Sequence, residues 1–80
     1  MYRDRRPVFE KMNETVHVGT QVIGESVRLF HITLQESGKF ELKIYGLDRK
    51  IVGLFNTFDA AVNAANLESD EFFRKRDLNG

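Results

Sequence analysis

The side chains that could carry catalysis or hold a metal are few in this chain. His17 and His31 are its two histidines, and cysteine is absent. Zinc sites are usually built from histidines and cysteines at short, regular spacings, and no such spacing is present. No serine lies in a strained-turn motif, and no set of serine, histidine and aspartate is recognisable. We therefore predict a protein that is not an enzyme and that needs no metal or other cofactor.

Several basic and aromatic side chains could instead contact a nucleic acid or another protein. Residues 1–12 and residues 39–50 each hold four basic and two acidic side chains, so each segment has a net charge of +2. Arginine and lysine can contact phosphates, and tyrosine can stack on a base or anchor a protein contact. The candidates are Arg3, Arg5, Arg6, Lys43, Tyr45 and Arg49. The formal net charge of the whole chain is zero, so it is not a strongly basic protein.

Length and composition limit the elements that can position these side chains. The 80 residues predict one domain, because so short a chain cannot divide its core between two units. Hydrophobic residues make up 41% of the sequence and aromatic residues 11%, which is enough for a packed core. The absence of cysteine favours a reducing compartment, and no apolar run is long enough for a secretory leader or a membrane span. We expect a soluble, cytoplasmic protein without membrane contact.

The first two thirds of the chain show the pattern of a sheet. Residues 27–35, VRLFHITLQ, alternate as a half-buried strand does, and the turn ESGK leads to a partner over residues 40–45. The turn GLDR leads to a third strand over residues 50–55, with Val52 and Leu54 on one side. Residues 15–23 predict a further strand, with Gly19 as a possible bulge. Residues 1–12 form an N-terminal arm or an edge strand, because Pro7 disfavours a central position.

After Asn56 the spacing of apolar residues changes to three and four, which predicts a helix from Phe58 to about Arg76. Thr57 is the expected N-cap. The alternative is a break at residues 66–69, with Ser69 capping a second short helix. The predicted fold is α+β, a single domain over residues 13–80 with three to four antiparallel strands and one C-terminal helix packed across one face. The predicted core consists of Phe30, Leu42, Ile44, Val52, Phe55, Ala61 and Ala65.

The segment from Ser37 to about Asn66 resembles the AP2-type DNA-binding domain of plant regulators and phage homing endonucleases. In that family an aromatic residue opens the middle strand, and an LG-x-F-x-T segment leads into an alanine-rich helix. Here Phe40 is the aromatic residue, and VGLFNTFDAAVNAA follows the pattern from Val52 onward without a gap. A similar combination of strand, turn, threonine cap and helix occurs in the arm-binding domains of tyrosine integrases.

The resemblance implies a small, non-enzymatic protein that lays its sheet in a groove of DNA, since sheets are known readers of DNA grooves. The positions that correspond to the family's DNA-binding face are Lys43, Tyr45, Arg49, Ile51, His31 and Thr33. Ile51 stands where the family has an exposed tryptophan. The arginines at positions 3, 5 and 6 would form an auxiliary arm on the phosphates.

The alternative function is that of a compact, protein-binding inhibitor or adaptor, of the kind that phages and other viruses with small genomes encode. Such a protein would use the same face, or an unpaired strand edge, against a host protein. Zero net charge favours this interpretation, and the pattern of hairpin and helix favours DNA binding. A homodimer is also expected, because pairing of strand edges or of the region around Phe72 and Phe73 would bury surface that a short chain leaves exposed.

Overall fold

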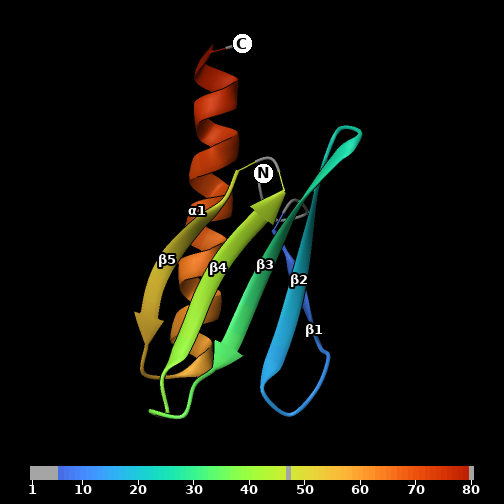
Figure 1. Ribbon diagram of the computed structural model, residues 1–80. Helices are drawn as coiled ribbons and strands as arrows, with labels where there is room; N and C mark the ends of the chain where they lie inside the picture. Colours follow the sequence, from blue (N-terminus) through green and yellow to red (C-terminus); the bar gives the residue numbers. More distant parts are fainter. Residues whose placement is uncertain (1–5, 47, 80) are drawn as a thin grey trace.

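The computed structural model of the protein describes residues 6–46 and 48–79. It contains the strands β1 (Val8–Lys11), β2 (Val16–Ile23), β3 (Ser26–Leu34), β4 (Phe40–Gly46) and β5 (Lys50–Phe55), followed by the helix α1 (Phe58–Asn79). The strands form one antiparallel sheet in the order β1-β2-β3-β4-β5, so each strand pairs with its neighbour in the sequence (Figure 1). The α+β prediction is confirmed, but the sheet has five strands rather than three to four.

The additional strand comes from the N-terminal segment. β1 lies at one edge of the sheet and pairs with β2, with Val8 opposite Thr20 and Lys11 opposite His17. Pro7 immediately precedes the strand, where the missing backbone N–H removes no ladder hydrogen bond. Gly19 is not a bulge, because the register runs past it without a shift. Its hydrogen faces the ring of Phe9 on β1, which leaves no room for a larger side chain.

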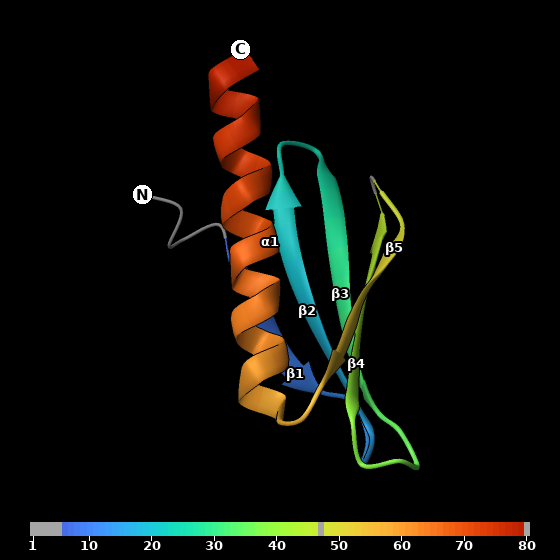
Figure 2. The ribbon, with the colours of Figure 1, turned by 90° about the vertical axis from the view of Figure 1, so that its left-hand side faces the viewer.

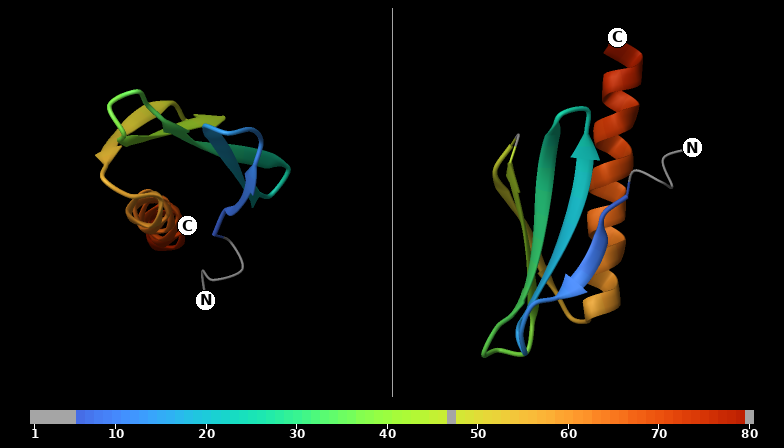
Figure 3. Two further views of the ribbon diagram at one scale, coloured as in Figure 1. Left: turned by 90° about the horizontal axis from the view of Figure 1, so that it is seen from below. Right: turned by 90° about the vertical axis from the view of Figure 1, so that its right-hand side faces the viewer.

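The helix lies across one face of the sheet, and the sheet arches over it (Figures 2 and 3). Thr57 caps its first turn, as predicted, by accepting a hydrogen bond from the backbone N–H of Ala60 over 3.0 Å. The alternative of a break at residues 66–69 is wrong, because α1 continues through these residues. The face that meets the sheet is a row at intervals of four, formed by Ala61, Ala65, Ser69 and Phe73, all of them buried.

The core lies between this row and the middle strands. Six side chains that are fully shielded from solvent form its centre: Phe30, Ile32, Leu42, Ile44, Ala61 and Ala65. Val52 and Phe55, which were predicted to be buried, pack against this cluster but are only half-buried. Small alanines allow the helix to approach the sheet closely. At the first residue of the helix, the ring of Phe58 meets the rings of Phe9 and Phe40 edge to face.

Ion pairs tie the helix to both edges of the sheet. Next to β1, Arg6 donates two hydrogen bonds to the carboxylate of Asp70, one of them at 3.0 Å. On β5, the ammonium of Lys50 lies 2.8 Å from the carboxylate of Glu68. Both pairs are partly exposed, so each contributes little stability. Their geometry nevertheless favours the arched form of the sheet, because each edge is drawn toward the same helix.

A register shift in the β4–β5 pair changes which side chains of β5 face the helix. Leu42 pairs with Gly53, whereas Lys43 pairs with Ile51, so Val52 is the additional residue of a β-bulge. Val52 therefore points to the core, and Leu54 points away from it and is 55% exposed. The prediction that these two side chains share one side was wrong, because a strict period of two does not survive a bulge.

Gly46, at the end of β4, should be far less tolerant of alanine than Gly38. Both have a positive φ, +116° and +89° respectively, but a Cβ on Gly46 would also overlap the carbonyl oxygen of Val27, whereas a Cβ on Gly38 would meet open space. We expect Gly38→Ala to lower the free energy of unfolding by about 1 kcal/mol and Gly46→Ala by clearly more, about 2–4 kcal/mol. Urea unfolding of the two variants measures this difference. Equal losses would show that β3 and β4 are not closely apposed at Val27.

Candidate functional site

The face of the sheet that α1 does not cover, called the outer face below, carries most of the side chains that the sequence singled out. The registers place His31 opposite Lys43, Lys43 opposite Ile51, and Thr33 opposite Glu41. Tyr45 follows Lys43 on the same side of β4, and its ring meets the ring of His31 edge to face at 4.7 Å. The outer face also includes Val8, Val18, Thr20, Val22, Val27, Leu29 and Leu54.

The outer face is more aliphatic than the sequence analysis indicated. Among the described residues, seven large hydrophobic side chains are strongly exposed, and five of them lie here. Their exposed fractions are 75% for Val8, 63% for Val22, 44% for Val27, 65% for Ile51 and 55% for Leu54. The alternation along residues 15–23 could have revealed this, because Val16, Val18 and Val22 share one face of the strand, and His17, Gly19 and Gln21 lie on the other.

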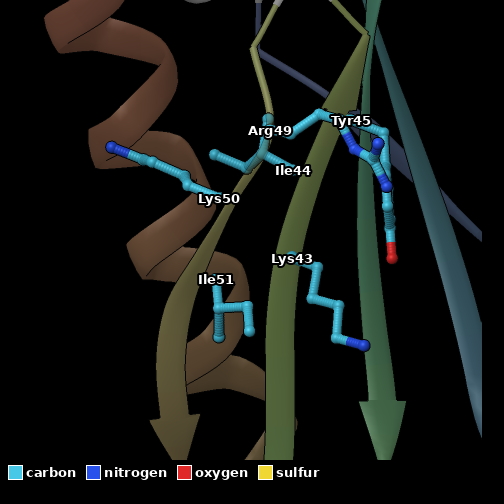
Figure 4. A pocket seen from close by; sticks show the side chains of 6 residues that line it. All are labelled: Lys43, Ile44, Tyr45, Arg49, Lys50 and Ile51. Carbon is cyan, nitrogen blue, oxygen red and sulfur yellow. The ribbon is translucent and has the colours of Figure 1, made fainter.

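A small hollow, of about 300 Å³, lies on the outer face where β4 and β5 shift register. Its lining residues are Lys43, Ile44, Tyr45, Arg49, Lys50 and Ile51. Figure 4 shows Arg49 reaching from the β4–β5 connection to Tyr45, and its guanidinium carbon lies 5.7 Å from the centre of that ring. Lys50 points instead toward the helix, where it meets Glu68. The hollow is therefore basic, with an aromatic and an aliphatic wall.

A network of hydrogen-bonded polar side chains on the other side of the sheet supports the hollow. The guanidinium of Arg28 donates to both carboxylate oxygens of Asp48, at 2.9 and 3.0 Å, and to the side-chain carbonyl of Gln21 at 3.2 Å. Gln21 in turn donates to the hydroxyl of Ser69 on the helix. Since Asp48 directly precedes Arg49, this network fixes the β4–β5 connection and with it the position of Arg49. None of these four polar residues was predicted to belong to the site.

The arginine itself is enclosed by aromatic rings. Its side chain is 2% exposed, and the guanidinium carbon lies 4.4 Å from the ring centre of Phe72 and 5.2 Å from that of Phe30. A guanidinium can stack on aromatic faces while its N–H groups bond in its own plane, which a lysine cannot do. The buried charge is thus paired, hydrogen-bonded and covered. These are the conditions under which a cation is tolerated in a core.

The environment of His31 lowers the pKa of its imidazole below the usual 6.5, chiefly because the side chain is partly buried and secondly because Lys43 lies opposite it. The unfolded chain then binds more protons than the folded one, so stability is lost as the pH falls below 6.5 toward the lowered pKa. At neutral pH the imidazole is uncharged. It therefore contributes aromatic surface, rather than positive charge, to the outer face.

Titration of His31 by NMR should show this lowered pKa, and Lys43→Met should raise it. The expected rise is partial, because the methionine removes the repulsion from the lysine and leaves the burial unchanged. Glu14→Gln, which alters an exposed carboxylate in the β1–β2 turn, is the matched control and should leave the pKa of His31 where it was. A pKa above 6.5 in the parent protein would contradict the packing of His31 against Tyr45.

The predicted N-terminal arm is separate from this face. Arg6 is engaged with Asp70 of the helix, on the opposite side of the sheet, and this contact raises the pKa of Arg6 and lowers that of Asp70. Arg3 and Arg5 lie outside the described residues. In the part of the chain that the structure describes, no three histidine, cysteine or acidic side chains are grouped as a metal ion would require. No helix within it is long and apolar enough to cross a membrane.

Comparisons of this chain with protein-family models, with curated proteins and with solved structures found no match. The resemblance of residues 37–66 to the AP2-type domain therefore stays a prediction. The segment that carries it corresponds to β4, β5 and the first half of α1. β1, β2 and β3 lie outside that segment, and the five strands of the sheet exceed the family's three.

Proposed function

We propose that this protein is a non-enzymatic protein-binding module and that the outer face is its interface. The observation that carries the proposal is the concentration of exposed aliphatic side chains on that face, from Val8 and Val22 at one edge to Ile51 and Leu54 at the other. Exposed apolar side chains that gather on one face of a domain mark contact sites. Burying one such side chain contributes about 1.5–3 kcal/mol, so a few of them suffice for a specific contact.

Nucleic-acid binding is the second candidate, and the basic hollow is the observation that favours it. Lys43, Arg49 and Lys50 line the hollow together with Tyr45, which could stack on a base. Two of these three cations already have carboxylate partners. A phosphate backbone would gain nothing from the exposed aliphatic side chains of Ile51 and Leu54. The outer face therefore supports a protein partner better than it supports DNA or RNA.

The proposed function is tested by site-specific photo-cross-linking in the cells that normally contain the protein. A photoreactive residue at position 54 lies on the outer face, and one at position 67 replaces Leu67, which is 65% exposed on the helix. We expect a discrete protein adduct from position 54 and none from position 67. Ile51→Glu should weaken this adduct about tenfold or more, because it places a charge against apolar surface of the partner, and Leu67→Glu should leave it unchanged.

Two other measurements decide between the remaining partners. Light scattering at micromolar concentration shows whether the partner is a second copy, because the monomer mass is 9.3 kDa. Titration with a DNA duplex at about 50 mM salt tests the second candidate, because every phosphate contact adds to the salt dependence of binding. If DNA binds, Lys43→Ala should lower the salt slope by about one. Binding of DNA without any protein adduct would overturn the proposal.

A further inference from the structure

The hollow on the outer face has positive charge that the protein itself does not fully neutralise. Lys43 lies 3.4 Å from Glu41, and Lys50 lies 2.8 Å from Glu68. Arg49 makes no ion pair with any described residue, and none of the residues that line the hollow is acidic. A carboxylate or phosphate placed in the hollow would therefore meet the available guanidinium of Arg49.

The size of the hollow restricts what can enter it. Pockets that enclose a whole small-molecule ligand measure about 300–1,000 Å³, and this hollow, at about 300 Å³, is at the lower limit. It can take the end of one acidic side chain. The rest of the occupant must lie outside the hollow, over the neighbouring strands.

Those strands present aliphatic side chains to the rest of the occupant. Ile51 forms one wall of the hollow and Leu54 follows it on β5, and they are 65% and 55% exposed. A free phosphate or a nucleic-acid backbone in the hollow would leave both side chains in water. A peptide whose acidic residues alternate with aliphatic ones would cover them, and burial of apolar surface would add to the ionic contact.

The curvature of the sheet also favours a narrow occupant over a second copy of the protein. The sheet arches over α1, so its outer face is convex (Figure 3). Two convex faces meet only along a strip, whereas a stable interface covers about 800 Å² on each partner. An extended segment can follow the convex surface along a strand, because it needs contact only over its own width.

From these observations, and resting on the proposed function, we propose that the partner presents an extended segment in which acidic residues alternate with aliphatic ones. One carboxylate of the segment enters the hollow and pairs with Arg49, and the adjacent aliphatic side chains lie on Ile51 and Leu54. The Arg28–Asp48 contact holds the β4–β5 connection so that Arg49 is in place before the segment arrives.

Selection from a random peptide library displayed on phage tests this proposal without knowledge of the partner. The full-length protein is the bait, and the Arg49→Glu variant is selected in parallel. We expect the parent to enrich peptides that are acidic and rich in leucine, isoleucine or valine, and the variant to lose the preference for acidic residues. Enrichment of neutral or basic peptides, or of none, would overturn the proposal.

The leading acidic peptide, labelled with fluorescein, then serves as the probe in anisotropy titrations. Arg49→Gln should raise its Kd about fivefold, the upper range for a partly exposed ion pair, and replacing one glutamate of the peptide by glutamine should have the same effect on the parent. Arg74→Gln removes an equally charged, exposed side chain on the helix and should change the Kd less than twofold. A Kd that does not respond to Arg49→Gln would contradict the proposal.

A charge exchange gives the sharpest result. A peptide carrying lysine in place of the critical glutamate should bind Arg49→Glu better than it binds the parent, which a general loss of folding in the variant could not produce. Failure of the acidic-segment proposal can be distinguished from failure of the proposed function. If the adduct from position 54 forms but is neither displaced by the acidic peptide nor weakened by Arg49→Gln, the outer face binds a protein of different chemistry. If no adduct forms, the interface itself is wrong.

Discussion

Arg28→Ala is expected to lower the free energy of unfolding by about 3–5 kcal/mol, the range seen when one partner of a buried charge pair is removed. The substitution takes away three hydrogen bonds to Asp48 and Gln21 and leaves a space between the rings of Phe30 and Phe72. Urea denaturation followed by circular dichroism measures the loss. The Arg28→Lys variant keeps the charge but loses the planar set of N–H donors. Its free energy of unfolding should therefore lie between that of the parent and that of Arg28→Ala.

A double-mutant cycle with Asp48→Ala separates the ion pair from the packing of the guanidinium. Asp48 is 38% exposed at its side chain, so its carboxylate can be solvated when Arg28 is absent. We therefore expect Asp48→Ala to cost less than Arg28→Ala, and the double variant to cost little more than Arg28→Ala alone. Strictly additive losses would show that the two side chains do not interact. The β4–β5 connection would then be held by other contacts.

Leu42→Ala is expected to cost about 2–5 kcal/mol, because Leu42 is fully shielded at the centre of the core and the neighbouring side chains can collapse only partly into the space. Leu54→Ala on the adjacent strand is the matched control. Leu54 faces away from the helix, so its loss should change stability by no more than about 0.5 kcal/mol. Equal losses would mean that the bulge does not redirect β5, and a loss well below 1 kcal/mol for Leu42 would mean that the faces of β4 are reversed.

The strand and helix pattern was predictable where local periodicity is unbroken. In residues 27–35 and 40–45 the buried side chains alternate with more exposed ones, and the placement of His31, Thr33, Lys43 and Tyr45 on one face follows from that period alone. The helix followed from the change of period after Asn56 and from the threonine cap. The strand over residues 8–11 could not be separated from an arm, because four residues beside a proline carry too little signal.

The parts of the site that were missed depend on contacts between residues far apart in the sequence. Arg28 lies two residues before Phe30, so the strand period alone predicts that its side chain points to the core. Nothing in the neighbouring sequence identifies Asp48 and Gln21 as its partners. The bulge in β5 could not be predicted from the sequence either, because it depends on the register in which β5 pairs with β4 and not on the residues of β5 alone. The aliphatic outer face was readable in the sequence, but its valines look the same in a strand that is buried on both sides.

The consecutive pairing of the strands has a consequence for how the chain reaches its folded state. Each hairpin closes between segments that adjoin in the sequence, and such local contacts form quickly because little chain must be immobilised to make them. The contact between Arg6 and Asp70 spans 64 residues and joins the segment before the first strand to the helix. We expect the meander to assemble hairpin by hairpin, with the helix docking afterwards and the contact between Arg6 and Asp70 forming last.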